Sequence, residues 1–96
     1  MAKQRIIWSS GAKLDLFEIL DFYYKRNGSK TYSIKLNSDF RKAIKVIEKY
    51  PNLGIQTDIS NTRVLTEGIY AIFYEIKTEV IEITGIWDCR QKPKRY

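Results

Sequence analysis

Two apolar segments near the end of the chain, residues 69–76 and 80–87, constrain its fold more than any other feature. Side chains in the first segment alternate between two faces, which is the period of a β-strand. The second segment is rich in β-branched residues, and only three residues separate the two. We therefore predict an antiparallel hairpin closed at Lys77-Thr78, preceded by a short strand that begins at Val64-Leu65.

The part of the chain before Pro51 indicates one strand and two helices. Residues 3–8 are β-branched and aromatic, as in an opening strand. Apolar residues then recur at helical spacing in two stretches that are separated by a stop signal at Asn27-Gly28. We predict an antiparallel helical hairpin with almost no loop. Three further aromatic residues widen the apolar stripe of the first helix and suggest that it packs on more than one side: Phe17, Phe22 and Tyr24.

Together these elements predict a single α+β domain over residues 1–96 with the order β-α-α-β-β-β. An antiparallel helical hairpin packs on a small, mainly antiparallel sheet. The polar segment from Ile55 to Thr62 is predicted to be a loop. Alternation places Trp87 on the face of the last strand that packs against the helices, and Ile86 on the opposite face. The predicted core is Ile7, Leu16, Ile19, Leu20, Leu36, Phe40, Ile44, Ile47, Ile72, Ile81 and Ile83.

The charge of the chain points to polyanionic or acidic partners. Seventeen basic residues against eleven acidic ones give a net charge of +6, which favours nucleic acid or an acidic protein surface. Lys42, Lys45 and Lys49 share one face of the second helix, which is predicted to be solvated. Basic residues also concentrate at the end of the chain.

Several classes of chemistry and location are excluded or disfavoured by composition. With no histidine, a histidine acid–base pair and a histidine-ligated metal site cannot form. We expect no metal and no other cofactor. The single cysteine, Cys89, cannot form an intrachain disulfide and fits a reducing cytoplasm. No stretch approaches the roughly 18 apolar residues of a membrane span, so a cytoplasmic protein without membrane association is expected.

Six segments, spread over nearly the whole chain, carry a resemblance through their order and spacing. They are Trp8-Ser9 with Ala12 and the run Asp15–Ile19; Tyr32–Ile47; Pro51–Gly54; Arg63–Leu65; Tyr70–Tyr74; and Ile86–Pro93. In this order they resemble the toxins of the RelE/ParE superfamily of bacterial type II toxin–antitoxin systems. The resemblance implies a toxin that arrests growth and is held inactive by a co-expressed antitoxin, which wraps its sheet and helical hairpin.

The resemblance leaves two targets open. Toxins of the RelE branch are metal-independent endoribonucleases that cut mRNA in the ribosome, with sheet arginines and lysines and a tail tyrosine in place of histidines. Arginines there stabilise the phosphorane. Residues that match this pattern as catalytic groups are Arg63, Arg90 and Tyr96, with Lys92, Lys94 and Arg95 as target-binding residues. The two arginines are expected to converge beside the hairpin. Ala71 stands where the ribonucleases usually have another arginine.

Toxins of the ParE branch instead poison DNA gyrase, with no established catalytic residues. The helical hairpin that begins at Ala12 resembles that branch slightly better. A third hypothesis is a non-enzymatic module that binds antitoxin after losing its catalytic cations. Structural roles compete with these assignments: Arg63 could pair with an acidic neighbour, Asp58 or Glu67, and Arg90 could pair with Asp88.

Overall fold

The computed structural model describes residues 4–90, which form two helices and a five-stranded sheet. In chain order the elements are β1 (Arg5–Trp8), α1 (Ser10–Asn27), α2 (Thr31–Lys49), β2 (Ile55–Gln56), β3 (Thr62–Glu67), β4 (Tyr70–Ile76) and β5 (Val80–Asp88). The strand order in the sheet is β1-β5-β4-β3-β2, with β1 and β5 parallel and the other neighbours antiparallel. The α+β fold and its helical hairpin are thus confirmed.

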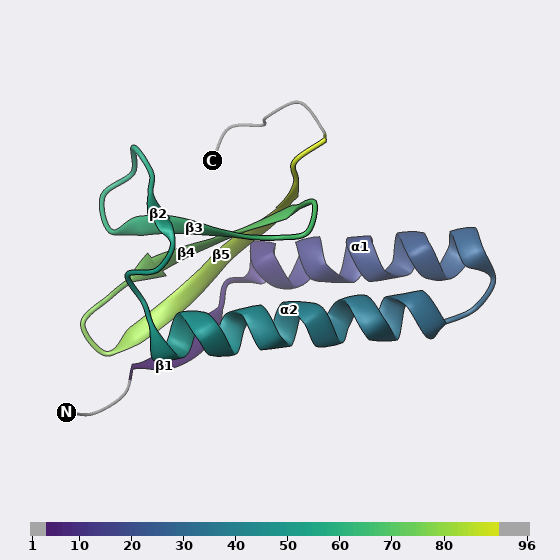
Figure 1. Cartoon of the computed structure of the whole chain (residues 1–96), viewed down its shortest axis with the longest axis horizontal. Helices are drawn as coiled ribbons and strands as arrows, with labels where there is room; N and C mark the ends of the chain where they lie inside the picture. Colours follow the sequence, from purple (N-terminus) through teal and green to yellow (C-terminus); the bar gives the residue numbers. More distant parts are fainter. Residues whose placement is uncertain (1–3, 91–96) are drawn as a thin grey trace.

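The helical hairpin extends well beyond the sheet (Figure 1). The side chain of Ser9 caps α1 by accepting a hydrogen bond from the Ala12 amide at 3.0 Å. Gly28 ends the helix in the left-handed conformation, with φ of 68°, and its amide donates to the Tyr24 carbonyl. Because α2 begins at Thr31, almost no chain is left between the helices, and they run side by side.

One predicted loop contains a short strand. Residues Ile55 and Gln56 pair with Val64 and Arg63 of β3 and form the edge of the sheet. The prediction of a loop over the whole of residues 55–62 was therefore wrong at its start. It was also wrong at its end, because β3 begins at Thr62 and not at Val64. Backbone pairing at a two-residue edge strand leaves no side-chain period in the sequence, because both residues remain exposed.

A β-bulge in β5 changes which side chains face the helices. Tyr74 pairs with Ile83 and Phe73 pairs with Gly85, so Thr84 is an extra residue on β5. The extra residue reverses the alternation beyond it. Ile86 therefore lies opposite Ile72 and is buried, against the prediction that it faces away from the core. Trp87 lies opposite Ala71 on the other face, so its predicted packing against the helices was wrong.

The core lies between the hairpin and the sheet. Seven predicted members are buried, and three from α1 pack against the core while partly exposed. Ile7 is 37% exposed, so the prediction that it belongs to the core was wrong. On β1 it is Ile6 and Trp8 that pack against the core, and the residue between them faces the other side of the sheet. No helix in residues 4–90 is long and apolar enough to cross a membrane.

Candidate functional site

Arg63 of β3 holds the turn that follows α2. Its Nη1 donates to the carbonyl oxygens of Gly54, at 2.6 Å, and Asn52, at 3.2 Å. The side chain therefore binds backbone carbonyls, and the predicted alternative of an ion pair with Asp58 or Glu67 is not what the structure shows. One guanidinium thus donates to two carbonyl oxygens of the same turn. Arg63 therefore stabilises the conformation of this turn at one end of the sheet.

Tyr74 binds the same turn from β4, directly opposite Arg63. Its hydroxyl donates to the Pro51 carbonyl at 2.7 Å and accepts from the Gly54 amide at 2.9 Å. Burial raises the pKa of Tyr74, so the phenol stays protonated at neutral pH and serves as a structural donor. The side chain of Tyr74 is fully buried, so this residue is part of the core.

At the opposite end of the sheet, Arg90 forms an ion pair with Asp88. The Nε and Nη2 atoms lie 3.1 and 2.8 Å from the two carboxylate oxygens, and the Arg90 amide also donates to Oδ1 at 2.8 Å. These bonds hold the pKa of Asp88 below its usual value and raise the pKa of Arg90. The predicted structural alternative for Arg90 is therefore confirmed. About 62% of the Arg90 side chain nevertheless remains exposed.

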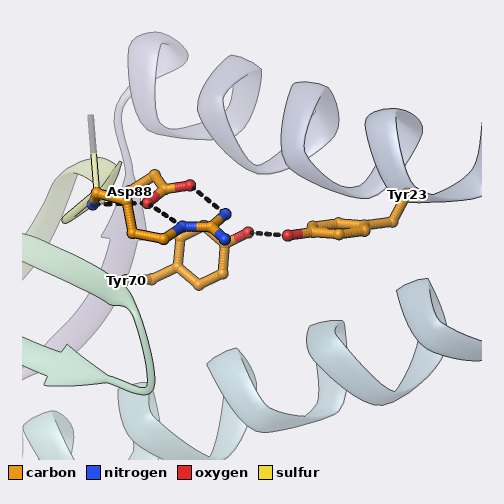
Figure 2. A network of polar contacts seen from close by, with 4 residues as sticks. Tyr23, Tyr70 and Asp88 are labelled. Carbon is orange, nitrogen blue, oxygen red and sulfur yellow. Dashed lines mark hydrogen bonds and ion pairs between the residues drawn. The ribbon is translucent and has the colours of Figure 1, made fainter. Parts of the chain in front are cut away.

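Two tyrosines lie beside this ion pair and connect it to the helices (Figure 2). The hydroxyls of Tyr70, on β4, and Tyr23, on α1, are 3.2 Å apart, and a hydrogen bond with Tyr23 also contributes to the raised pKa of Arg90. The ring of Tyr70 packs edge-on against Phe40 of α2, with centroids 5.2 Å apart. Burial raises the pKa of Tyr70, so its phenol is a poor base.

The register of the sheet keeps Arg63 and Arg90 apart. Arg63 lies opposite Tyr74, whereas Asp88, two residues before Arg90, lies opposite Tyr70. These levels differ by four residues, or about 13 Å along the strands, and β3 and β5 are two strand spacings apart, about 10 Å. The expected convergence was wrong because β5 runs past the level of Arg63 to the far end of the sheet. Four other predicted site residues lie outside the described residues: Lys92, Lys94, Arg95 and Tyr96.

The position where the ribonuclease branch carries an arginine is closed in this chain. Ala71 is 6% exposed and lies between Thr66 of β3 and Trp87 of β5. Its methyl group supplies no charge to a phosphate. Within residues 4–90, no three Cys, Asp or Glu side chains gather into a cluster that could hold a metal ion.

An apolar groove between α1 and α2 was not predicted as a site. It has a volume of about 320 Å³. Phe17 of α1 and Ile34 of α2 are its most exposed apolar residues, at 64% and 66%. The extra aromatic residues on α1 were its sequence signal, because they exceed what one core-facing stripe needs. The groove is lined by Phe17, Leu20, Asp21, Tyr24, Lys30, Ser33, Ile34 and Asn37.

Comparison with known proteins gives the family of this fold. A family model described as the ParE toxin of the type II toxin–antitoxin system parDE matches residues 6–93. The chain therefore belongs to the ParE toxin family, and it is the toxin component of a type II toxin–antitoxin module. Such a module implies an antitoxin partner.

A solved structure shares the same fold. It is described as the chromosomal ParDE TA system from P. aeruginosa, and it aligns with a TM-score of 0.75 at 23% sequence identity. The alignment covers 88% of this chain and 94% of that chain, so the two folds correspond over nearly their full length. Among curated proteins, none matches the sequence significantly.

Proposed function

We propose that this toxin acts by binding DNA gyrase and not by cutting mRNA on the ribosome. The observation that carries the proposal is the separation of Arg63 from Arg90 across the sheet. Cleavage by the neighbouring 2′-hydroxyl requires a base, an acid and a cation that stabilises the phosphorane, all around one phosphate. Arg63 is bound to two carbonyls, Arg90 is bound to Asp88, and Ala71 supplies no cation. A toxin that works by binding needs no such convergence.

In this proposal, Arg90 is the first residue of the surface that contacts the target, and Lys92, Lys94, Arg95 and Tyr96 continue it. Its guanidinium is exposed, and Asp88 fixes its orientation. Replacing Arg90 with alanine should relieve growth arrest while antitoxin binding remains. Arg90→Lys should restore toxicity only in part, because lysine keeps the charge but loses the fork geometry.

A direct test compares the two targets in parallel. Purified toxin is added to DNA gyrase with plasmid DNA, and supercoiling and DNA cleavage are followed on gels. The same toxin is added to translating ribosomes, and mRNA cleavage is mapped by primer extension. We expect inhibited supercoiling or accumulated DNA breaks, with intact mRNA. Codon-dependent mRNA cleavage with unaffected gyrase would overturn the proposal and return Arg63 and Arg90 to a catalytic role.

We further propose that the antitoxin covers the groove between α1 and α2. Exposed apolar side chains gathered in a groove are typical of a protein-binding site. Because apolar contacts are not screened by salt, the complex should survive a few hundred millimolar salt, where exposed ion pairs are screened within about 8 Å or less. Gel filtration of the complex at low and high salt tests this. Complete dissociation at high salt would show that the interface is mainly electrostatic.

A further inference from the structure

The outer face of α2 carries an unpaired row of lysines. The buried residues of α2 face the core, and Lys42, Lys45 and Lys49 lie on the opposite side at spacings of three and four. All three side chains are exposed. With a rise of about 1.5 Å per residue, the row is about 10 Å long. We call these three residues the lysine face.

The charge of the lysine face is not compensated within the described part of the chain. The ion pairs formed by residues 4–90 use Lys25, Lys35, Lys77 and Arg90, and none uses a residue of the lysine face. Glu48 lies on the same helix without forming an ion pair, and Arg41, next to Lys42, is also exposed. Over residues 41–49 there are four basic residues and one acidic residue, which leaves a local charge of +3.

The composition of this face favours one class of partner. Protein interfaces are depleted in lysine at their centres and depend on aromatic or apolar anchors. Single-stranded nucleic acid requires aromatic side chains on which bases stack. The lysine face has mobile point charges, and beside it lies Tyr50, which is 55% exposed and has the Lys49 ammonium 5.5 Å from its ring centroid. One ring does not provide the series of stacking surfaces that successive bases need. Point charges in a row suit the phosphates of duplex DNA, which are contacted without regard to sequence.

We propose that the lysine face binds the backbone of the duplex DNA that gyrase holds, so that the toxin contacts enzyme and DNA together. This inference rests on the proposed action on gyrase. The groove between the helices reaches along α2 only to Asn37, five residues before Lys42. The lysine face and the apolar groove are therefore separate parts of the helix, and one serves DNA while the other serves a protein.

The first experiment measures DNA binding without gyrase. A fluorescein-labelled 20-bp duplex of arbitrary sequence is titrated with toxin, and anisotropy is recorded at several salt concentrations. Three phosphates neutralised by lysines contribute a slope of about −2.7 to the plot of log K against log salt. That contribution corresponds to an affinity loss of about 40-fold between 50 and 200 mM salt. The triple variant K42Q/K45Q/K49Q should lose this part of the slope.

A matched control removes the same charge elsewhere. The variant K13Q/K25Q/K77Q also loses three positive charges, from exposed positions on α1 and before β5. It should retain the wild-type salt slope. Circular dichroism checks that both variants remain helical. Equal slopes for the lysine-face variant and the control variant would overturn the inference.

The second experiment separates this inference from the proposed function. Binding of toxin to gyrase is measured with and without duplex DNA. The lysine-face variant should bind gyrase alone as the wild type does, and should lose the affinity that DNA adds. If DNA raises the gyrase affinity of wild-type toxin and of the lysine-face variant equally, the inference is wrong, but the proposed action on gyrase still holds. If wild-type toxin binds gyrase in neither condition, the proposed function itself fails.

Discussion

The two helices of the hairpin are similar in length but differ in what they bury. α2 buries six residues, including Phe40 and Ile47, whereas α1 buries only Ala12. Leu14, Phe17 and Phe22 of α1 are each more than half exposed. α2 is an amphipathic helix with one fully buried apolar face, and Ile34 is its most exposed apolar residue. α1 carries more apolar surface than the fold uses, and such a surplus indicates a helix that a partner covers.

The contacts of α1 explain how such a helix remains in place. Its first turns are fixed by the Ser9 cap, by buried Ala12 and by Asp15, whose carboxylate accepts from the Ile86 amide at 3.1 Å. Farther along, Ser33 of α2 donates to the Leu20 carbonyl at 2.7 Å. The rest of α1 extends beyond the sheet (Figure 1). Leu16, Ile19 and Leu20 pack against the core, and these polar contacts fix the helix further, while Phe17 and Phe22 remain exposed.

The largest expected effect is a loss of stability, and it should be much larger for a substitution in α2 than for one in α1. Phe40→Ala should lower the free energy of unfolding by about 3–5 kcal/mol, because the ring is fully buried against Tyr70. Phe17→Ala removes a ring that is 64% exposed, and should change the free energy by about 0.5 kcal/mol or less. Urea denaturation of the isolated toxin measures both. Similar losses of unfolding free energy from the two substitutions would show that the Phe17 side of α1 is part of the core.

A second comparison concerns the turns at the two ends of α2. Gly54→Ala should cost about 1–3 kcal/mol, because overpacking strains a filled site. Its Cβ would lie 2.5 Å from the Tyr74 hydroxyl and 2.9 Å from the Val64 carbonyl. Gly28→Ala meets no atom within 4 Å and should cost about 1 kcal/mol, from its φ of 68° alone. Thermal denaturation of both variants tests whether Gly54→Ala is the more destabilising of the two. A larger loss of stability from Gly28→Ala would contradict this prediction.

Antitoxin affinity should depend on exposed residues that contribute little to stability, and these come from both helices. Phe17→Ala and Ile34→Ala each remove an exposed apolar side chain from the groove. Each should weaken antitoxin binding by about 1–2 kcal/mol, roughly tenfold, as expected for anchors of a protein interface. Leu53→Ala is the matched control, because Leu53 is 56% exposed but lies outside the groove. Titration calorimetry measures all three, and unchanged affinities for the groove variants would place the antitoxin elsewhere.

The smallest expected effect concerns the ion pair beside Tyr23 of α1. Because Arg90 lowers the pKa of Asp88 in the folded state, the pair stabilises the fold above the carboxylate's ordinary pKa, near 3.8. That contribution disappears as the pH falls through the lowered pKa. Asp88→Asn should therefore reduce the melting temperature slightly at pH 7, and this difference should shrink as the pH falls into the acid range. A difference between the two proteins that is independent of pH would exclude the ion pair as its cause.

Most of the fold could be predicted because its signals are local. Helical spacing identified Leu36, Phe40 and Ile47, and the Asn27-Gly28 stop identified the hairpin. The failures have a common physical cause, since they depend on pairing between strands. The extra residue Thr84 moved Ile86 to the core face. Gly85 within the strand was a local signal of such a bulge, but strict alternation did not take it into account.

The candidate site was harder to predict for the same reason. Arg63 and Arg90 both flank the hairpin in sequence, but only the register shows that they lie at opposite ends of the sheet. The groove depends on which aromatic residues of α1 the sheet leaves uncovered. The sequence indicated the surplus of aromatic residues on that helix but not the direction in which they would be exposed.

The central claim is that α1 presents an unfilled binding surface while α2 completes the core. Hydrogen exchange with mass spectrometry, on the toxin alone and with its antitoxin, tests it most directly. Without antitoxin, amides in the second half of α1 should exchange faster than those around Phe40 of α2, because few buried contacts protect them. Antitoxin should slow exchange chiefly in residues 17–24. Equal protection of both helices in the free toxin, with no change in α1 on binding, would contradict the account.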